Sequence, residues 1–127
     1  MNQPAKIPKI LIVEDDEPIR SLYKLKLERE GFAVVTAENG QAGLHVARDA
    51  RPDLILLDLR MPVMSGDEML LKLRESAWGS DIRVIVLTNI SKSEAPQALR
   101  FLRVDRYIVK VHTTPSQVVE VVKEVLR

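Results

Sequence analysis

Five short apolar runs recur along the chain, and polar or helix-prone stretches separate them. The first, third and fourth runs are nearly continuous in Ile, Leu and Val, which is typical of strands buried on both faces of a parallel sheet. The strands predicted from these runs are Lys9–Val13, Phe32–Thr36, Leu54–Leu57, Arg83–Leu87 and Tyr107–Val109.

Four of the intervening stretches open with a recognisable helix-start signal. The signals are a proline suited to a first turn, an Asn-Gly turn, and two Ser/Thr residues followed three positions later by Glu or Gln. They stand at Pro18, Asn39-Gly40, Ser65-x-x-Glu68 and Thr114-x-x-Gln117. Each therefore predicts a helix after one of the strands.

A further helix, between the fourth and fifth strands, is complicated by Pro96. Ser91 and Glu94 also form a capping-box pattern, but a helix starting there would place Pro96 beyond the first turn, where proline removes an intrahelical hydrogen bond. We therefore expect this helix to start at Ser93, and we expect Pro96 to shorten or bend it.

The alternation of strands and helices indicates parallel strands joined by right-handed crossovers. The predicted fold is an α/β, doubly wound, five-stranded parallel sheet with five helices. The chain of 127 residues has the size of one domain, so we assign residues 1–127 to a single domain with a core of about 8–127 and an N-terminal tail at 1–7. Ligands of such sheets bind outside the carboxyl ends of the strands.

Composition narrows the possible functions. The formal charge is +1, from 19 Lys and Arg against 18 Asp and Glu, and the basic residues are scattered, so no nucleic-acid surface is visible. No cysteine is present, which excludes disulfides and thiolate metal sites. No apolar run approaches the roughly 18 residues of a membrane span. We expect a cytoplasmic protein that binds neither nucleic acid nor membrane.

The residues that directly follow four of the strands are polar and chemically versatile. They are Glu14, Asp15 and Asp16 after the first strand, Asp58 after the third, Thr88 after the fourth and Lys110 after the fifth. Acidic residues here could simply form the first turn of a helix, and the others could be ordinary loop residues. Their common position relative to the strands favours a shared site instead.

Carboxylates packed this closely repel one another unless a cation lies among them. Oxygen ligands without His or Cys favour a hard cation, and a few carboxylates with water suit Mg²⁺. An Asp beside Mg²⁺ and a Lys is suited to attack phosphorus as a nucleophile, because both cations neutralise charge on the transferring oxygens. A Thr88 hydroxyl could then donate to the phosphoryl group.

These residues resemble a known family pattern. The segments Ile10–Asp16, Pro52–Pro62, Ser65-Gly66, Val84–Asn89 and Tyr107–Lys110 are similar, in order and spacing, to the receiver domain of bacterial two-component response regulators. The resemblance extends from Lys9 to Arg127. It implies a flavodoxin-like sheet with strand order 2-1-3-4-5.

The resemblance also implies a role for each site residue. Asp58 would accept a phosphoryl group from the phosphohistidine of a sensor histidine kinase or phosphotransfer protein. The metal ligands would be Asp15, Asp58 and the Arg60 backbone carbonyl, with Glu14 acting through water. Thr88 and Lys110 would contact the phosphoryl oxygens, and Tyr107 would turn inward as Thr88 moves.

The output that the resemblance implies is a change of protein surface. The surface formed by the fourth helix, fifth strand and fifth helix, here about 93–126, would bind a downstream protein target. The domain would act as a monomer or as a phosphorylation-dependent homodimer. It would not be an enzyme in the usual sense, because it catalyses only its own phosphoryl transfer and dephosphorylation.

The sequence departs from the family at several positions. Proline usually follows the family's lysine in a cis peptide, but Val111 follows Lys110, so we expect a trans bond and a rearranged loop up to Pro115. Arg103 stands where glycine is frequent, so a left-handed backbone there would be strained. Arg60 and Ile90 lie beside the path of hydrolytic water in receivers, and we hypothesise that their bulk slows dephosphorylation.

Three other functions fit parts of the pattern. A haloacid-dehalogenase-type phosphatase would need a second Asp at position 60, where Arg stands. A flavodoxin-like flavin protein would need a Ser/Thr/Gly-rich phosphate loop where Glu14 and two aspartates stand, and more aromatic residues than the 4% present. A degenerate receiver acting as a phosphate-independent interaction module remains open, mainly because of the Lys110–Val111 step.

Overall fold

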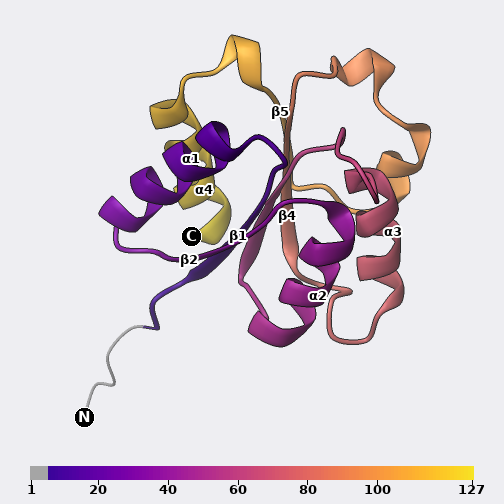
Figure 1. Ribbon diagram of the computed structural model, residues 1–127, viewed down its shortest axis with the longest axis horizontal. Helices are drawn as coiled ribbons and strands as arrows, with labels where there is room; N and C mark the ends of the chain where they lie inside the picture. Colours follow the sequence, from indigo (N-terminus) through magenta and orange to yellow (C-terminus); the bar gives the residue numbers. More distant parts are fainter. Residues whose placement is uncertain (1–5) are drawn as a thin grey trace.

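The computed structural model describes residues 6–127 and contains one five-stranded parallel sheet. Its strand order is β2-β1-β3-β4-β5, as the resemblance implied, so β3 is the central strand and β2 and β5 are the edges (Figure 1). The strands are β1 Lys9–Val13, β2 Ala33–Ala37, β3 Leu54–Leu57, β4 Arg83–Thr88 and β5 Arg106–Val109. Of the expected tail at 1–7, residues 1–5 lie outside the described part.

Four α-helices cover the two faces of the sheet, α1 and α4 on one and α2 and α3 on the other (Figure 1). Their bounds are α1 Glu17–Arg29, α2 Gly40–Ala50, α3 Gly66–Glu75 and α4 Pro115–Leu126. Asp16, Asn39, Ser65 and Thr114 cap these helices, because their side chains accept hydrogen bonds from first-turn amides. The last three stand at the predicted start signals, whereas Asp16 lies two residues before the signal at Pro18.

Side chains along each strand alternate between the two layers, because the side-chain period of a strand is two. In β1, Ile10 and Ile12 face the α1–α4 layer, whereas Leu11 and Val13 face the α2–α3 layer. All four are almost completely buried, which explains why this strand appears in the sequence as a continuous apolar run.

The helix expected to start at Ser93 is absent, so the prediction of five helices was wrong. Two short 3₁₀ helices, η1 Lys92–Glu94 and η2 Gln97–Phe101, connect β4 to β5 instead. Ala95 lies between them with φ −65° and ψ 149°, an extended conformation. A residue before proline is pushed out of the helical region by the proline ring, so Pro96 divides the segment into two turns.

The loops before and after β5 depart from the family pattern at Arg103 and after Lys110, the positions where the sequence differs from it. No cis peptide occurs in residues 6–127, and the 3₁₀ helix η3 Lys110–His112 fills the rearranged loop before Pro115. Arg103 has φ 55°. Its carbonyl accepts a hydrogen bond of 2.9 Å from the Arg74 guanidinium, which also donates to carbonyls at Leu102, Gly79, Ser80 and Ile82. Arg74 thus fixes α3 to the turn before β5.

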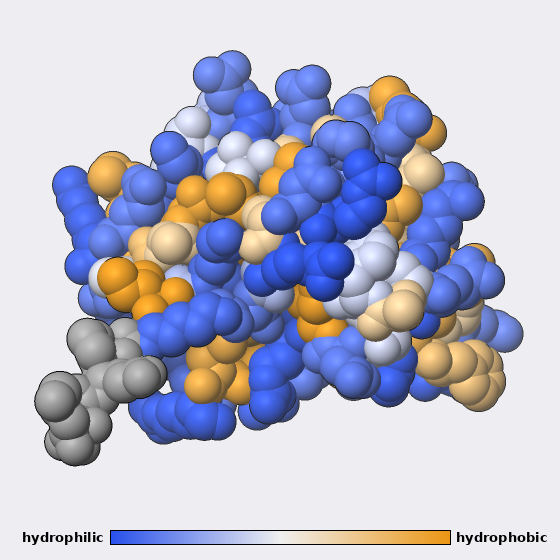
Figure 2. Space-filling model, turned by 90° about the horizontal axis from the view of Figure 1, so that it is seen from below, coloured by the Kyte–Doolittle hydropathy of each residue, from blue (hydrophilic) through white to orange (hydrophobic). Residues whose placement is uncertain are grey.

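The surface viewed from below is a mixture of hydrophilic side chains and separate apolar patches (Figure 2). Within the described residues, none of the helices has both the length and the apolar character that crossing a membrane requires.

Candidate functional site

The strand pleat gathers three charged side chains on the α1–α4 side of the sheet edge. Ile12, Leu56 and Ile108 face that layer, so the residues two positions later, Glu14, Asp58 and Lys110, emerge on the same side. The sequence predicted that these residues share an edge, and the structure brings their charged groups into direct contact.

Lys110 is the centre of this contact. Its Nζ donates a hydrogen bond to Glu14 Oε1 and another of 3.3 Å to Asp58 Oδ2. Glu14 and Asp58 are 4% and 7% exposed, so both carboxyl groups lie mostly out of water. A buried charge is stable only when it is paired, and a single ammonium pairs with both carboxylates here.

Burial shifts the pKa of Glu14 strongly. Removal from water raises this pKa to about 7, although the hydrogen bonds from Lys110 and from the Asp16 amide lower it and the negative charge of Asp58 adds to the rise. Burial lowers the pKa of Lys110, but its hydrogen bond to Glu14 and the charge of Asp58 outweigh burial, so the net direction is upward. The lysine therefore stays charged.

The acidic run after β1 divides between the site and the helix. Asp16 is the N-cap of α1, where its Oδ1 accepts from the Ile19 amide at 3.0 Å, and Glu17 lies in the first helical turn. These two residues fit the helix-start interpretation. Glu14 and Asp15 instead contribute to the site, with Asp15 exposed at its rim.

Oxygen atoms of Glu14, Asp15 and Asp58 lie within 4.8 Å of one another. Three carboxylate oxygens at that spacing, with no nitrogen or sulfur donor among them, suit a hard divalent cation such as Mg²⁺. The donor set therefore fits the predicted metal. The carbonyl of Arg60 as a further ligand stays a prediction.

Local contacts hold the Asp58 carboxylate in one orientation. The Leu59 amide donates to Oδ1 at 2.7 Å, while Oδ2 faces Lys110. The following loop returns tightly to α3, because the Gly66 amide donates to the Leu59 carbonyl at 2.9 Å. A Cβ atom at Gly66 would lie 2.0 Å from the Asp58 carbonyl oxygen. Only glycine permits this approach.

Thr88 and Tyr107 emerge on the opposite side of the sheet from Glu14 and Lys110. Val86 and Tyr107 belong to the α2–α3 layer, and Thr88 follows Val86 by two residues. Thr88 is 1% exposed. The Tyr107 hydroxyl donates to the Ile90 carbonyl at 2.7 Å. Tyr107 is thus bound to the segment just after Thr88.

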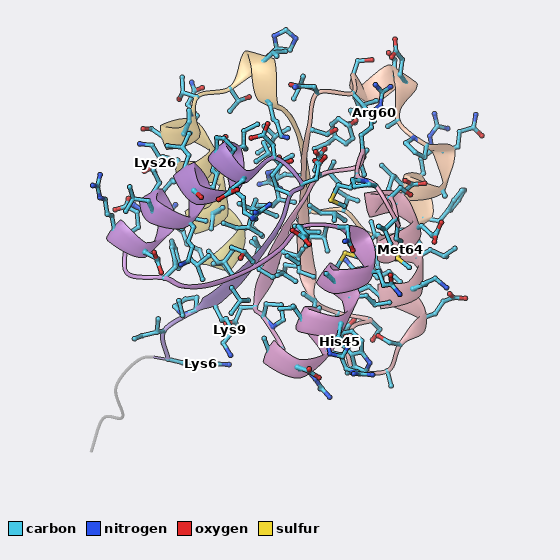
Figure 3. All side chains as sticks on the ribbon, viewed as in Figure 1. Lys6, Lys9, Lys26, His45, Arg60 and Met64 are labelled. Carbon is cyan, nitrogen blue, oxygen red and sulfur yellow. The ribbon has the colours of Figure 1, made fainter. Side chains whose placement is uncertain are left out.

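A cavity of about 350 Å³ opens beside the Asp58 carboxylate. Its lining residues are Asp58, Arg60, Thr88, Asn89, Ile90, Glu94 and Lys110. Figure 3 shows Arg60 at this edge of the sheet, whereas His45 lies on α2 toward the opposite edge. The cavity is large enough for a phosphoryl group and opens to solvent.

Two residues near the site were not predicted from the sequence. Glu94 lines the large cavity because Pro96 replaces the helix with turns. Tyr23 lies on the buried face of α1 beneath Glu14. The only sequence signal for Tyr23 was a hydroxyl in a stripe of otherwise aliphatic helix positions.

The fold and the site together define a class of protein, a doubly wound α/β domain in which three carboxylates and a lysine gather at the carboxyl ends of the strands. The sequence matches the response regulator receiver domain family over residues 10–123. The chain belongs to this family, whose members serve in two-component systems.

Individual relatives agree with this assignment. The chain is 40% identical to the phosphate regulon transcriptional regulatory protein PhoB of Pseudomonas aeruginosa, over 93% of this chain and 51% of that protein. It is 39% identical to the transcriptional regulatory protein ResD of Bacillus subtilis, over 94% of this chain and 48% of that protein. The chain thus spans about half the length of the curated relatives it matches.

Solved structures show the same fold. The chemotaxis response regulator CheY4 of Vibrio cholerae superimposes with a TM-score of 0.86 at 28% identity, covering 94% of this chain and 99% of that one. The response regulator TrrA of Thermotoga maritima, solved with Mg²⁺ and BeF, gives 0.81 at 33% identity, covering 93% and 98%.

Proposed function

We propose that this receiver domain is a phosphorylation-controlled switch that accepts a phosphoryl group on Asp58. The observation that carries the proposal is the geometry of Asp58, a buried carboxylate held by the Leu59 amide and Lys110 at the floor of a 350 Å³ cavity. The proposed donor is the phosphohistidine of a sensor histidine kinase or phosphotransfer protein.

In this reaction a carboxylate oxygen of Asp58 attacks phosphorus as the bond from phosphorus to the donor's imidazole nitrogen breaks. The bonding electron pair leaves on the imidazole, which takes up a proton. Mg²⁺, held by Asp15, Asp58 and the Arg60 carbonyl with Glu14 acting through water, would neutralise charge on the transferring oxygens. Lys110 supplies a second positive charge and Thr88 a hydroxyl donor to the acylphosphate product.

The phosphoryl group would act on the surface through Thr88 and Tyr107. A phosphoryl group adds about two negative charges at neutral pH, and these attract the Thr88 hydroxyl. The Tyr107 hydroxyl donates a hydrogen bond to the carbonyl of Ile90, two residues after Thr88. A shift of Thr88 would therefore move the hydrogen-bond acceptor of Tyr107. A partner would distinguish the two states by binding only one of the two positions of the Thr88–Ile90 segment and Tyr107.

The proposed output is a change in binding to a downstream protein, with the domain acting as a monomer or a phosphorylation-dependent homodimer. The partner surface extends over η1, η2, β5 and α4, and we propose no role for it in binding nucleic acid or membrane. The domain would act in the cytoplasm and would catalyse only its own phosphoryl transfer and dephosphorylation.

The test is the intact mass of the full chain after incubation with Mg²⁺ and acetyl phosphate, with Asp58→Asn as the matched control. One added phosphoryl group, absent from the control and abolished by EDTA, is the expected result. No added mass, together with no heat of Mg²⁺ binding by calorimetry, would overturn the proposal and favour a phosphate-independent module.

A further inference from the structure

Tyr23 carries a hydroxyl that no part of the proposed mechanism uses. Tyr23 is 5% exposed, and its side chain belongs to the core beneath the α1–α4 layer. Among residues 6–127 its hydroxyl has no hydrogen-bond partner, yet no buried polar side-chain atom there lacks one, so the hydroxyl itself keeps contact with solvent. The hydroxyl is therefore free to exchange water for an acceptor on the protein.

The hydroxyl lies beside the acidic site. A cavity of about 10 Å³ beneath the sheet edge is lined by nine residues, of which only Glu14, Tyr23 and Asp58 carry polar side chains. Long side chains on a helix lean toward its N-terminus, and the N-terminus of α1 follows directly from the acidic run. Tyr23, one turn after Ile19, therefore extends toward Glu14.

Electrostatics agree with this placement. Burial raises the pKa of the Tyr23 hydroxyl, the positive charge of Lys110 lowers it, and the negative charge of Glu14 raises it again. Both charges thus act on the hydroxyl, which stays protonated and able to donate.

Glu14 has room for a further hydrogen-bond donor when Lys110 leaves it. Here Lys110 bonds to Glu14, and the Asp16 amide donates to the other carboxylate oxygen at 3.2 Å. In the phosphoryl-loaded state proposed above, Lys110 turns to the phosphoryl oxygens. The Glu14 oxygen that Lys110 leaves, on a side chain that is 5% exposed, then has lone pairs for the metal-held water proposed above and for one further donor.

We propose that Tyr23 is a positioning residue whose hydroxyl donates to the Glu14 carboxylate when Lys110 turns to the phosphoryl group. The inference rests on the proposed function, because it concerns the state in which the acceptor is loaded. The 10 Å³ cavity gives the two side chains room to approach. Tyr23 would thereby favour the loaded state over the metal-free one.

The test compares wild type with Tyr23→Phe, using Mg²⁺ with beryllofluoride as a tetrahedral mimic of the phosphoryl group. Tyr23→Phe should bind beryllofluoride about 3- to 10-fold more weakly, the effect of one hydrogen bond, while its affinity for Mg²⁺ alone stays unchanged. Its metal-free form should unfold at the same temperature as wild type or higher, because no hydrogen bond is lost. Ile19→Val is the packing control: it alters the same cavity without a polar group and should retain wild-type beryllofluoride affinity.

A spectroscopic signature reports the hydroxyl directly. The chain has only two tyrosines, so ¹³Cζ-tyrosine labelling gives two signals, which Tyr107→Phe assigns. The Tyr23 signal should shift when Mg²⁺ and beryllofluoride are added together, and not with Mg²⁺ alone.

The outcomes separate the two proposals. Wild type that binds neither Mg²⁺ nor beryllofluoride would overturn the proposed function and the inference with it. Wild type that binds both, with Tyr23→Phe unchanged in beryllofluoride affinity or weakened only in proportion to lost stability, would overturn the inference alone. An unmoved Tyr23 signal in the loaded protein would do the same.

Discussion

Replacing Lys110 with methionine isolates the electrostatic core of the site. The lysine side chain is 13% exposed and is the cation that pairs with both Glu14 and Asp58. Methionine fills a similar volume without the charge. It leaves two buried carboxylates whose oxygens lie within 4.8 Å of each other.

The expected cost follows from that separation. Two unit charges 4.8 Å apart repel by about 3 kcal/mol at an effective dielectric constant of about 20. Removing one partner of a buried pair typically costs about 3–5 kcal/mol. We therefore expect metal-free Lys110→Met to lose up to about 3 kcal/mol of unfolding free energy at about pH 8, because Glu14, no longer stabilised by Lys110, must there either ionise beside Asp58 or take up a proton.

The loss should depend on pH and metal. At about pH 5, Glu14 in the folded variant is protonated and the repulsion disappears, so the loss should fall to about half. Excess Mg²⁺ at the higher pH should restore most of the stability, because the cation replaces the missing charge.

Urea unfolding, with EDTA or with Mg²⁺ at each pH, measures these differences. The control is Lys123→Met, which removes a half-exposed lysine that pairs with Glu30 at 2.6 Å and should change stability little at either pH. An equal loss for Lys110→Met at both pH values, or no loss in EDTA, would refute the reasoning.

Three further predictions concern the same edge of the sheet. The pKa of Glu14 is raised from 4.5 to about 7 in the fold, so protonated Glu14 stabilises the metal-free protein below about pH 4.5. Up to about 3 kcal/mol of this stability is lost as the pH rises to 7. Thermal unfolding in EDTA should show this pH dependence in wild type and not in Glu14→Gln. Gly66→Ala should slow phosphorylation by acetyl phosphate at least about 10-fold, because its Cβ would lie 2.0 Å from a carbonyl oxygen. The control Gly31→Ala, at a position with φ 93° and open space around it, should cost about 1 kcal/mol of stability and leave that rate unchanged. Equal phosphorylation rates for the two variants would contradict this prediction. Arg60→Asn with Ile90→Glu should shorten the lifetime of the phosphorylated protein, measured by loss of the added mass, and a longer lifetime in the double variant would contradict a blocking role for the two bulky side chains.

Local and periodic features were predictable because they depend on neighbours in the chain. The apolar runs located all five strands to within one residue, and the helix-start signals at Pro18, Asn39, Ser65 and Thr114 located the four α-helices. The segment around Pro96 was the exception, since the conformational restriction on Ala95 outweighed the capping-box pattern.

The sequence predicted which residues lie at the site but not which of them contact one another. Strand ends identified Glu14, Asp15, Asp58, Thr88 and Lys110 as neighbours, because parallel strands end at one edge. Their positions in the sequence did not indicate that Lys110 would bond to Glu14 as well as Asp58. The carboxylates that Lys110 contacts depend on which side chains the fold buries together.

The sequence by itself determined the alternation of strands and helices, the chemistry available at the strand ends and the trans bond after Lys110, because each follows from a residue's own conformational preferences or from period-two patterning. Only the tertiary structure decided that Arg74 bonds to carbonyls as far as 29 residues away, that Glu94 lines the cavity beside Asp58 and that Tyr23 lines a small cavity together with Glu14. These contacts join residues distant in the chain, and they form only after the sheet and its covering layers have fixed which side chains share a buried space.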